Sequence, residues 1–151
     1  MRENSNNKIK YLTQQEAIRL FNAIIFSDNS HAVRDLALFR VAYRCGLRAS
    51  EISLIKLDDY NADKGDLYCK RLKGSNNNTI RLDVTTKKAL DKYIRDYKIS
   101  CNSETLFKSQ KNNPISRQTL DYLMKNIVKL LILVIKVNII FIHLNTQLLF
   151  I

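Results

Sequence analysis

Hydrophobic residues recur at three- and four-residue spacing in the N-terminal part of the chain, which predicts two amphipathic helices. The first begins after Thr13, because Thr13 and Glu16 form a capping box. Its apolar face comprises Ala17, Leu20, Phe21 and Ile24. The second covers residues 32–44, is apolar on most sides and is therefore expected at the centre of the fold. Gly46 ends this helix.

A short third helix and two longer helices are predicted further along the chain. We expect Ser50 to cap the short helix, which runs to about Ile55. Thr85 or Thr86 caps the next helix, and Ser116 caps the last one. The apolar faces of the two longer helices comprise Leu90, Tyr93, Ile94 and Tyr97, and then Leu120, Leu123, Met124 and Ile127.

Two segments between these helices alternate apolar and polar residues, which predicts strands. They cover residues 67–72 and 79–84, and the turn-forming sequence Lys-Gly-Ser-Asn-Asn-Asn lies between them. We therefore expect an antiparallel hairpin, with a third short strand near residues 56–60. The predicted fold class is mixed α+β and mainly helical, with helices around a small antiparallel β-hairpin or three-stranded sheet.

Composition adds a preference for a polyanionic partner. The 151 residues carry 25 Lys and Arg against 14 Asp and Glu, a net charge of +11, which favours nucleic acid or an anionic membrane surface. The three cysteines are widely spaced and form no metal pattern with the two histidines, so we expect reduced thiols, no metal and no cofactor in a cytoplasmic protein. Residues 1–10 form a polar, flexible lead-in without the apolar centre of a signal peptide.

The segment Cys-Gly-Leu-Arg-Ala-Ser-Glu-Ile at residues 45–52 combines a helix end with a cation. Gly46 ends one helix and Ser50 begins the next, so Arg48 is held at a chain reversal beside the positive end of a helix. Backbone N–H groups and a guanidinium at one point make an anion site, and the planar fork of arginine suits phosphate. A helix–turn–helix joint with a surface arginine also fits these residues.

Residues 46–52, Gly-Leu-Arg-Ala-Ser-Glu-Ile, resemble the first conserved box of the tyrosine recombinases, the phage-integrase family. The resemblance implies that Arg48 is the first catalytic arginine, which grips the scissile DNA phosphate, and that Glu51 helps to hold it. It runs over residues 11–127, which we expect to form part of a tyrosine recombinase catalytic domain. The succession of three helices, a hairpin and two helices fits that domain.

The hairpin continues the resemblance at residues 71–74, Arg-Leu-Lys-Gly. In this family a hairpin lysine acts as general acid on the leaving 5′ oxygen, and Lys73 matches that position best. A lysine can do so because burial and neighbouring cations can lower its pKa. Lys70 and Arg71 are weaker candidates for this role and are expected to contact the DNA backbone. The alternative for Lys73 is a solvent-exposed turn lysine.

Residues 114–118, Pro-Ile-Ser-Arg-Gln, resemble the helix start that family members press against duplex DNA. Ser116 as the N-cap directs free N–H groups at a phosphate, and Arg117 adds charge. An ordinary capped helix with a solvent-exposed arginine is the alternative. The resemblance therefore predicts two further DNA-binding residues, Ser116 and Arg117.

The chain departs from the family after this last helix. A full recombinase requires a His-x-x-Arg box, a His or Trp, and a tyrosine nucleophile that forms a 3′-phosphotyrosyl link. No tyrosine follows Tyr122, and His143 is followed by Leu-Asn-Thr. We therefore assign no nucleophile, expect no strand exchange by this chain unaided, and leave open whether it is an enzyme. The N-terminal core-binding domain of the family is not found either.

Residues 128–151 change abruptly to Leu, Ile, Val, Asn and Phe, a composition typical of AT-rich codons in a wrong reading frame. When the frame is shifted to the third base of each codon from Phe141 onward, it can spell His-Ser-Phe-Lys-His, close to His-x-x-Arg-His. We therefore expect that a frameshift near residues 127–131 replaced the true C-terminus. The alternative is a membrane anchor over residues 127–151, although lysine, asparagine and histidine interrupt its apolar run.

Three functions remain open at this stage. The first is a DNA-binding fragment of a site-specific tyrosine recombinase (integrase) of a mobile element, inactive alone, with double-stranded DNA and other recombinase protomers as partners. The second is a non-catalytic DNA-binding protein or dominant-negative regulator of an intact recombinase. The third is a membrane-anchored basic protein. The first two predict no membrane partner.

Overall fold

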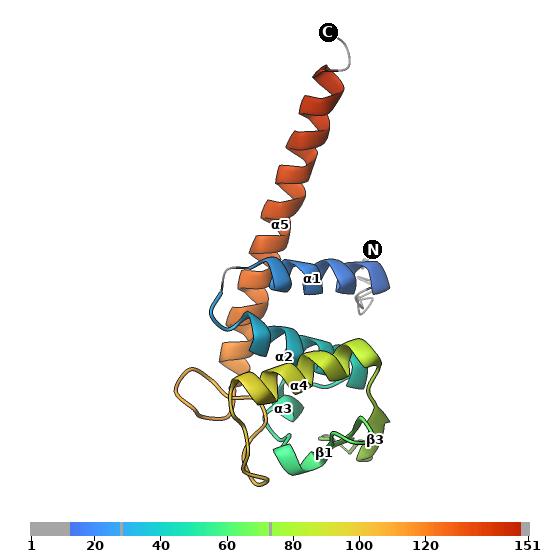
Figure 1. The fold of residues 1–151 in the computed structure, drawn as a ribbon, viewed down its shortest axis with the longest axis vertical. Coiled ribbons are helices and arrows are strands. Elements are labelled where there is room, and N and C mark those ends of the chain that lie inside the picture. The colour runs from blue at the N-terminus through green and yellow to red at the C-terminus, as the bar shows by residue number, and fades with distance from the viewer. Residues whose placement is uncertain (1–12, 28, 73, 149–151) are drawn as a thin grey trace, which may run out of the picture.

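The computed structural model describes residues 13–27, 29–72 and 74–148. Its helices and strands surround one hydrophobic core, and a long C-terminal helix extends away from it (Figure 1). In chain order the elements are α1 (Gln14–Phe26), α2 (Ala32–Cys45), α3 (Ala49–Ile52), the 3₁₀ helix η1 (Leu57–Asp59), β1 (Tyr60–Asn61), β2 (Asp66–Cys69), β3 (Asn78–Arg81), α4 (Val84–Asp96) and α5 (Arg117–Leu148). The predicted class, mainly helical with a small antiparallel sheet, is confirmed.

Helix α1 begins at the predicted capping box. The Thr13 hydroxyl accepts the N–H of Glu16 at 3.2 Å, and the Glu16 carboxylate accepts the N–H of Thr13 at 2.8 Å. Two otherwise unpaired donors at the helix start are thereby satisfied. The four predicted apolar positions of α1 are buried, as is Ala23.

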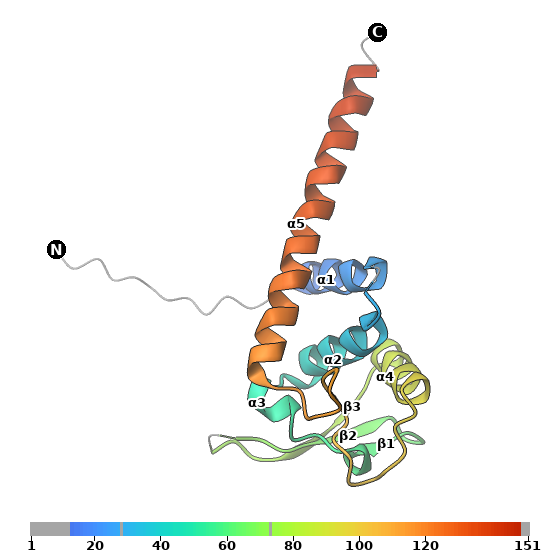
Figure 2. The same ribbon diagram turned by 90° about the vertical axis from the view of Figure 1, so that its left-hand side faces the viewer.

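Helix α2 is the central element, packed against α1 on one side and α4 on the other (Figure 2). It ends as predicted at Gly46, whose φ of 61° lies in the left-handed region that glycine adopts readily. The backbone N–H of Gly46 donates to the carbonyl of Ala42, which closes the last turn. The chain reversal at residues 46–48 therefore follows from this glycine.

Two predicted helix caps are wrong. Helix α3 begins after Arg48 rather than Ser50 and ends at Ile52, because the Glu51 carboxylate binds the N–H of Arg48 at 2.8 Å. Helix α4 is capped by Asp83, whose carboxylate accepts the N–H of Thr86 at 3.3 Å. A carboxylate is favoured over a hydroxyl at the positive end of a helix, so the neighbouring threonines do not cap α4.

The sheet has three antiparallel strands in the order β1-β2-β3, with Leu67 of β2 opposite Ile80 of β3. The predicted third strand exists, but it begins at Tyr60 rather than near Lys56. Lys56 instead forms an isolated bridge to Thr105. The paired strands also end earlier than the alternation predicted, β2 at Cys69 and β3 at Arg81, and α4 already begins at residue 84.

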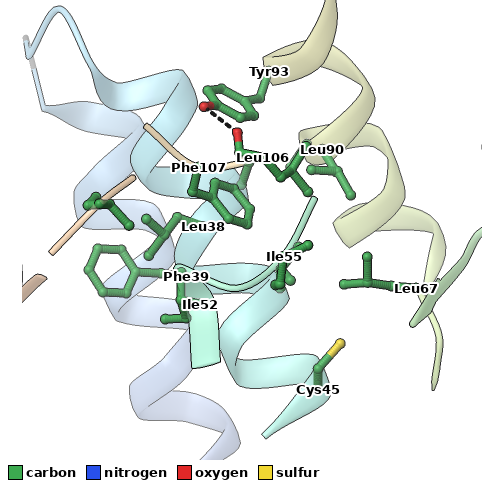
Figure 3. Packing of buried hydrophobic residues seen from close by; sticks show 14 of the residues in the cluster. Leu38, Phe39, Cys45, Ile52, Ile55, Leu67, Leu90, Tyr93, Leu106 and Phe107 are labelled. Atoms are coloured by element: carbon green, nitrogen blue, oxygen red, sulfur yellow. Dashed lines mark hydrogen bonds between the residues drawn. The ribbon is translucent and has the colours of Figure 1, made fainter. Parts of the chain in front are cut away.

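The core lies between α2, α4, β2 and the segment that leads to α5 (Figure 3). The Tyr93 ring stacks on Phe107 with centroids 5.5 Å apart, and its hydroxyl donates to the buried Leu106 carbonyl at 2.8 Å. Tyr97, predicted on the same face of α4, is at the surface. It follows the last residue of α4, and its hydroxyl meets His31 Nδ1 at 2.9 Å.

Helix α5 packs on the domain only near its start. Leu120, Leu123 and Ile127 are buried as predicted and Met124 is half-buried, whereas Val128, Ile132, Leu133 and Ile135 are exposed. The later turns extend beyond α1 with no other element beside them in either view (Figures 1 and 2). None of the helices in residues 13–148, leaving aside positions 28 and 73, is long and apolar enough to cross a membrane.

Candidate nucleic-acid interface

Arg48 follows the reversal that Gly46 imposes and precedes the first residue of α3. Its side chain is 46% exposed, so the guanidinium is available to a ligand. Arg48 Nη1 donates to the carbonyl oxygen of Leu72 at 3.0 Å. The arginine therefore reaches from the start of α3 to the loop that follows β2.

Glu51 is the buried centre of this region, with a side chain only 1% exposed. Its carboxylate accepts the N–H groups of Arg48 at 2.8 Å and Leu72 at 2.9 Å, and lies 3.7 and 3.8 Å from the guanidinium groups of Arg48 and Arg71. Burial opposes ionisation, but these hydrogen bonds and cations together hold the pKa of Glu51 below its usual value. Glu51 is therefore ionised at neutral pH.

Leu72 is attached to the arginine segment through both of its peptide groups. Its N–H binds Glu51 and its C=O accepts from Arg48. Leu72 is therefore held from both sides by Arg48 and Glu51. Lys73 itself lies outside the described residues, and its role stays a prediction.

Arg71 uses its guanidinium mainly within the fold. Nη2 donates to the Cys45 carbonyl at 2.7 Å, Nη1 to the Gly46 carbonyl at 3.0 Å, and Nε to Asn78 Oδ1 at 3.0 Å. The side chain is only 11% exposed. Arg71 thus fastens the hairpin to the end of α2, a function that the sequence analysis missed.

Lys70 is half-buried directly after β2.

The Asn77 side chain accepts the backbone N–H of Arg71 at 2.7 Å and closes the turn. The sequence signal for this side-chain-to-backbone bond was the run of asparagines at residues 76–78. Asn side chains often bind nearby backbone groups in turns.

Ser116 caps α5 as predicted, and its hydroxyl accepts the N–H of Thr119 at 3.1 Å. Ser116 and Arg117 are both exposed. The start of α5 lies against α3 in both views (Figures 1 and 2), so these side chains lie on the element next to the Arg48 segment. Within the described part of the chain, no cluster of His, Cys, Asp and Glu suits a metal ion.

This fold is similar to solved recombinase structures. The crystal structure of XerA recombinase superposes with a TM-score of 0.69 at 22% identity, over 86% of this chain and 45% of XerA. The XerH site-specific recombinase, solved bound to its difH substrate as a pre-cleavage complex, gives 0.65 at 19% identity, over 80% of this chain and 36% of XerH. These likenesses define the architecture as that of a recombinase domain.

The sequence model of the phage integrase family matches residues 10–137, and the chain belongs to this family, the tyrosine recombinases. Tyrosine recombinase XerC of Caldanaerobacter subterraneus subsp. tengcongensis is 35% identical over 121 residues. That match covers 79% of this chain and 33% of XerC, so the chain spans about a third of the relative's length.

Proposed function

We propose that this chain is a DNA-binding part of a site-specific tyrosine recombinase, and that it holds duplex DNA without cutting it unaided. The observation that carries the proposal is the double attachment of Leu72, at 2.9 Å to Glu51 and 3.0 Å to Arg48. The attachment unites the arginine segment with the predicted catalytic hairpin. A net charge of +11 and the likeness to XerH, solved with its DNA substrate, support a DNA partner.

In the proposed complex, Arg48 grips a backbone phosphate with the N–H groups that Leu72 does not occupy. Glu51 remains ionised and fixes the Arg48 segment against the hairpin. Lys73 supplies the second cation, the group predicted to protonate the leaving 5′ oxygen in an intact recombinase. These three residues have the roles that the resemblance to the family implies.

Flanking contacts complete the proposed interface. Ser116 and Arg117 bind the DNA backbone from the start of α5, and Lys70 does so from the end of β2. Arg71 contributes indirectly, because its guanidinium is bonded to two backbone carbonyls and an asparagine. All these contacts are to phosphate and sugar, which position a protein on DNA without reading its sequence.

The first test measures DNA binding by fluorescence anisotropy across a series of salt concentrations. Arg48→Gln should weaken binding and reduce the slope of log K against log salt by about 0.9, the value expected for one lost phosphate contact. Arg95→Gln is the matched control, because Arg95 is exposed at the far end of α4. Salt-independent binding, or equal effects of the two variants, would refute the proposal.

We further propose that residues 11–127 are part of a catalytic domain and that residues 128–151 come from a shifted reading frame. Within the 151 residues the last tyrosine is Tyr122, in the second turn of α5. Sequencing the gene past the codon for Ile151 tests this proposal. We expect another reading frame to encode the missing residues in order: a His, then an Arg or Lys, then a Tyr. An early stop codon without a tyrosine before it would contradict the proposed frameshift.

A strand-exchange assay separates the inactive fragment from an active enzyme. We expect no exchange on a cognate site, because no tyrosine follows Tyr122 to form the covalent 3′ link. The retention of phosphate-binding groups without a nucleophile also favours a second role, in which the chain occupies sites of an intact recombinase. Added to such an enzyme, it should then lower exchange in proportion to site occupancy. Strand exchange by this chain alone would contradict both roles.

A further inference from the structure

A pocket of about 300 Å³ lies between α1, the C-terminal half of α2 and the start of α4, outside the interface described above. Both apolar and charged or polar side chains line it. Its lining comprises Gln14, Ala17, Ile18, Phe21, Arg40, Tyr43, Arg44, Asp83 and Thr86. The predicted recombinase machinery uses none of these residues.

Two arginines enter this pocket from one side of α2. Arg40 and Arg44 are four residues apart and therefore neighbours on the helix surface. The Arg40 guanidinium lies over the Phe21 ring, with its Cζ 4.4 Å from the ring centroid. Arg40 Nε is buried, and no acceptor for it exists among the described residues. A buried donor without a partner costs free energy, so the hydrogen-bonding capacity of the Arg40 guanidinium is not fully used within the described chain.

Arg44 also lines the pocket, and the carbonyl of Arg81 accepts from its Nε at 3.1 Å and its Nη2 at 3.0 Å. These bonds use one edge of the planar guanidinium, so the opposite edge is available for a second acceptor. Two guanidinium groups that line the same pocket suit an oxygen-rich anion.

Asp83 sets the charge that the pocket accepts. Its carboxylate is bonded to the Thr86 N–H and, at 2.6 Å, to the Thr86 hydroxyl. Burial opposes ionisation, but the Thr86 bonds and Arg44 nevertheless keep the pKa of Asp83 below its usual value. Asp83 is thus ionised and balances one arginine, which leaves one net positive charge for a singly charged anion.

The pocket lies close to other basic residues. Arg44 is four residues before Arg48, and Arg71 binds the carbonyls of the two residues that follow Arg44. A phosphodiester carries one negative charge, which balances the net positive charge of the pocket. It also has several oxygens that can accept hydrogen bonds from the guanidinium groups.

We propose that Arg40 and Arg44 form a second phosphate site, which binds a backbone phosphodiester of the same duplex that Arg48 contacts. The inference rests on the proposed DNA-binding function and extends the contact surface along α2 toward α1. It gives the arginine pair a role in affinity rather than in strand cleavage.

The first pair of variants changes the charge of the pocket lining without removing packing. Gln14→Glu places a carboxylate in the pocket lining, and Gln15→Glu places the same charge on the next residue, which does not line the pocket. Both positions are in the first turn of α1, where an acidic residue favours the helix. Anisotropy measured across a series of salt concentrations should show weaker DNA binding for Gln14→Glu. For Arg44→Gln, the slope of log K against log salt should fall by about 0.9. The DNA affinity of Gln15→Glu should stay close to that of the unmodified chain.

The outcomes separate this inference from the proposed function. If the unmodified chain binds DNA but Gln14→Glu and Gln15→Glu have equal effects, or Arg44→Gln leaves the slope unchanged, the phosphate site is refuted and the DNA-binding function stands. If the unmodified chain does not bind DNA, both fail. A thermal-shift titration with inorganic phosphate is the second arm. One contrary result is that phosphate stabilises the unmodified chain but not Arg44→Gln, while neither Gln14→Glu nor Arg44→Gln changes DNA binding. That result would assign the pocket to a free anion and overturn the DNA assignment.

Discussion

The carboxylate of Glu51 connects two segments that are far apart in the sequence. It accepts one N–H from the start of α3 and one from the loop after β2, and it is almost fully excluded from solvent. A buried anion requires compensating partners, and here two backbone donors and two nearby guanidinium groups supply them. Glu51 therefore fixes the geometry of Arg48 more rigidly than a surface salt bridge would.

Glu51→Gln should lower the free energy of unfolding at pH 7 by about 1–3 kcal/mol, because the amide leaves one backbone donor unpaired. Since folding lowers the pKa of Glu51, its ionic contribution is fully present above the ordinary glutamate value of about 4.3. The contribution disappears as the pH falls through the lower folded-state pKa. Urea unfolding at several pH values should show the two proteins converging in acid, and a constant difference would contradict this account.

Gly46→Ala should destabilise the fold by about 1–2 kcal/mol, the cost of placing an L-residue in the left-handed region. An added Cβ at Gly46 would meet no heavy atom within 4 Å, so the cost is confined to the backbone. Gly46→Asn should cost less, since asparagine tolerates this conformation better. Thermal unfolding of the three proteins provides the measurement, and equal losses for Ala and Asn would contradict the backbone explanation.

At single positions the sequence indicated candidate site residues but not the bonds among them. Arg48 and Glu51 could be proposed as candidates because the helix end at Gly46 and the family resemblance mark this segment. The bonds of Arg71 to backbone carbonyls could not be predicted, because a sequence does not show which cation donates to the backbone. The contribution of Lys73 stays a prediction, since that residue is outside the described part of the chain.

At the scale of elements, periodicity predicted the helices well and their ends less well. The apolar faces of α1 and the first part of α5 are buried as expected, because helical spacing and burial have the same period. Caps are decided by competition among neighbouring polar residues, so Asp83 replaced the predicted threonines at α4. Strand lengths depended on tertiary pairing and on where α4 begins.

Helix α5 should respond differently to substitutions in its two halves. Leu123→Ala should lower the free energy of unfolding by about 2–5 kcal/mol, because it removes a buried side chain. The double change Ile132→Glu and Leu133→Glu should alter it by less than about 0.5 kcal/mol, since both side chains are about half exposed. Chemical denaturation monitored by circular dichroism gives both values. A large loss from the double change would show that the outer half of α5 packs on the domain.

At the scale of the whole molecule, strong positive charge is combined with a chain that spans about a third of a related recombinase. Its proposed contacts are to phosphate and sugar, which supply affinity but little discrimination among sequences. Fold class and family followed from sequence because they depend on periodicity and on a short motif. The arginine pocket could not be predicted, since it forms only when α1, α2 and α4 meet.

Two unrelated duplexes of equal length should therefore bind this chain with dissociation constants within about tenfold of each other, far from the 10³-fold or greater preference typical of specific DNA-binding proteins. Competition anisotropy at fixed salt measures the ratio. A preference of three orders of magnitude for one sequence would show that base edges are read, and would require contacts beyond the proposed interface.

The length of α5 also determines how the molecule rotates in solution. Its 32 residues extend to roughly 48 Å at 1.5 Å per residue, while α1 and α2 cross its direction (Figure 1). Such a body tumbles anisotropically, more slowly about its short axes than about its long one. Amide bond vectors in α5 are nearly parallel to the long axis, so their ¹⁵N transverse relaxation should be faster than that of amides in α2.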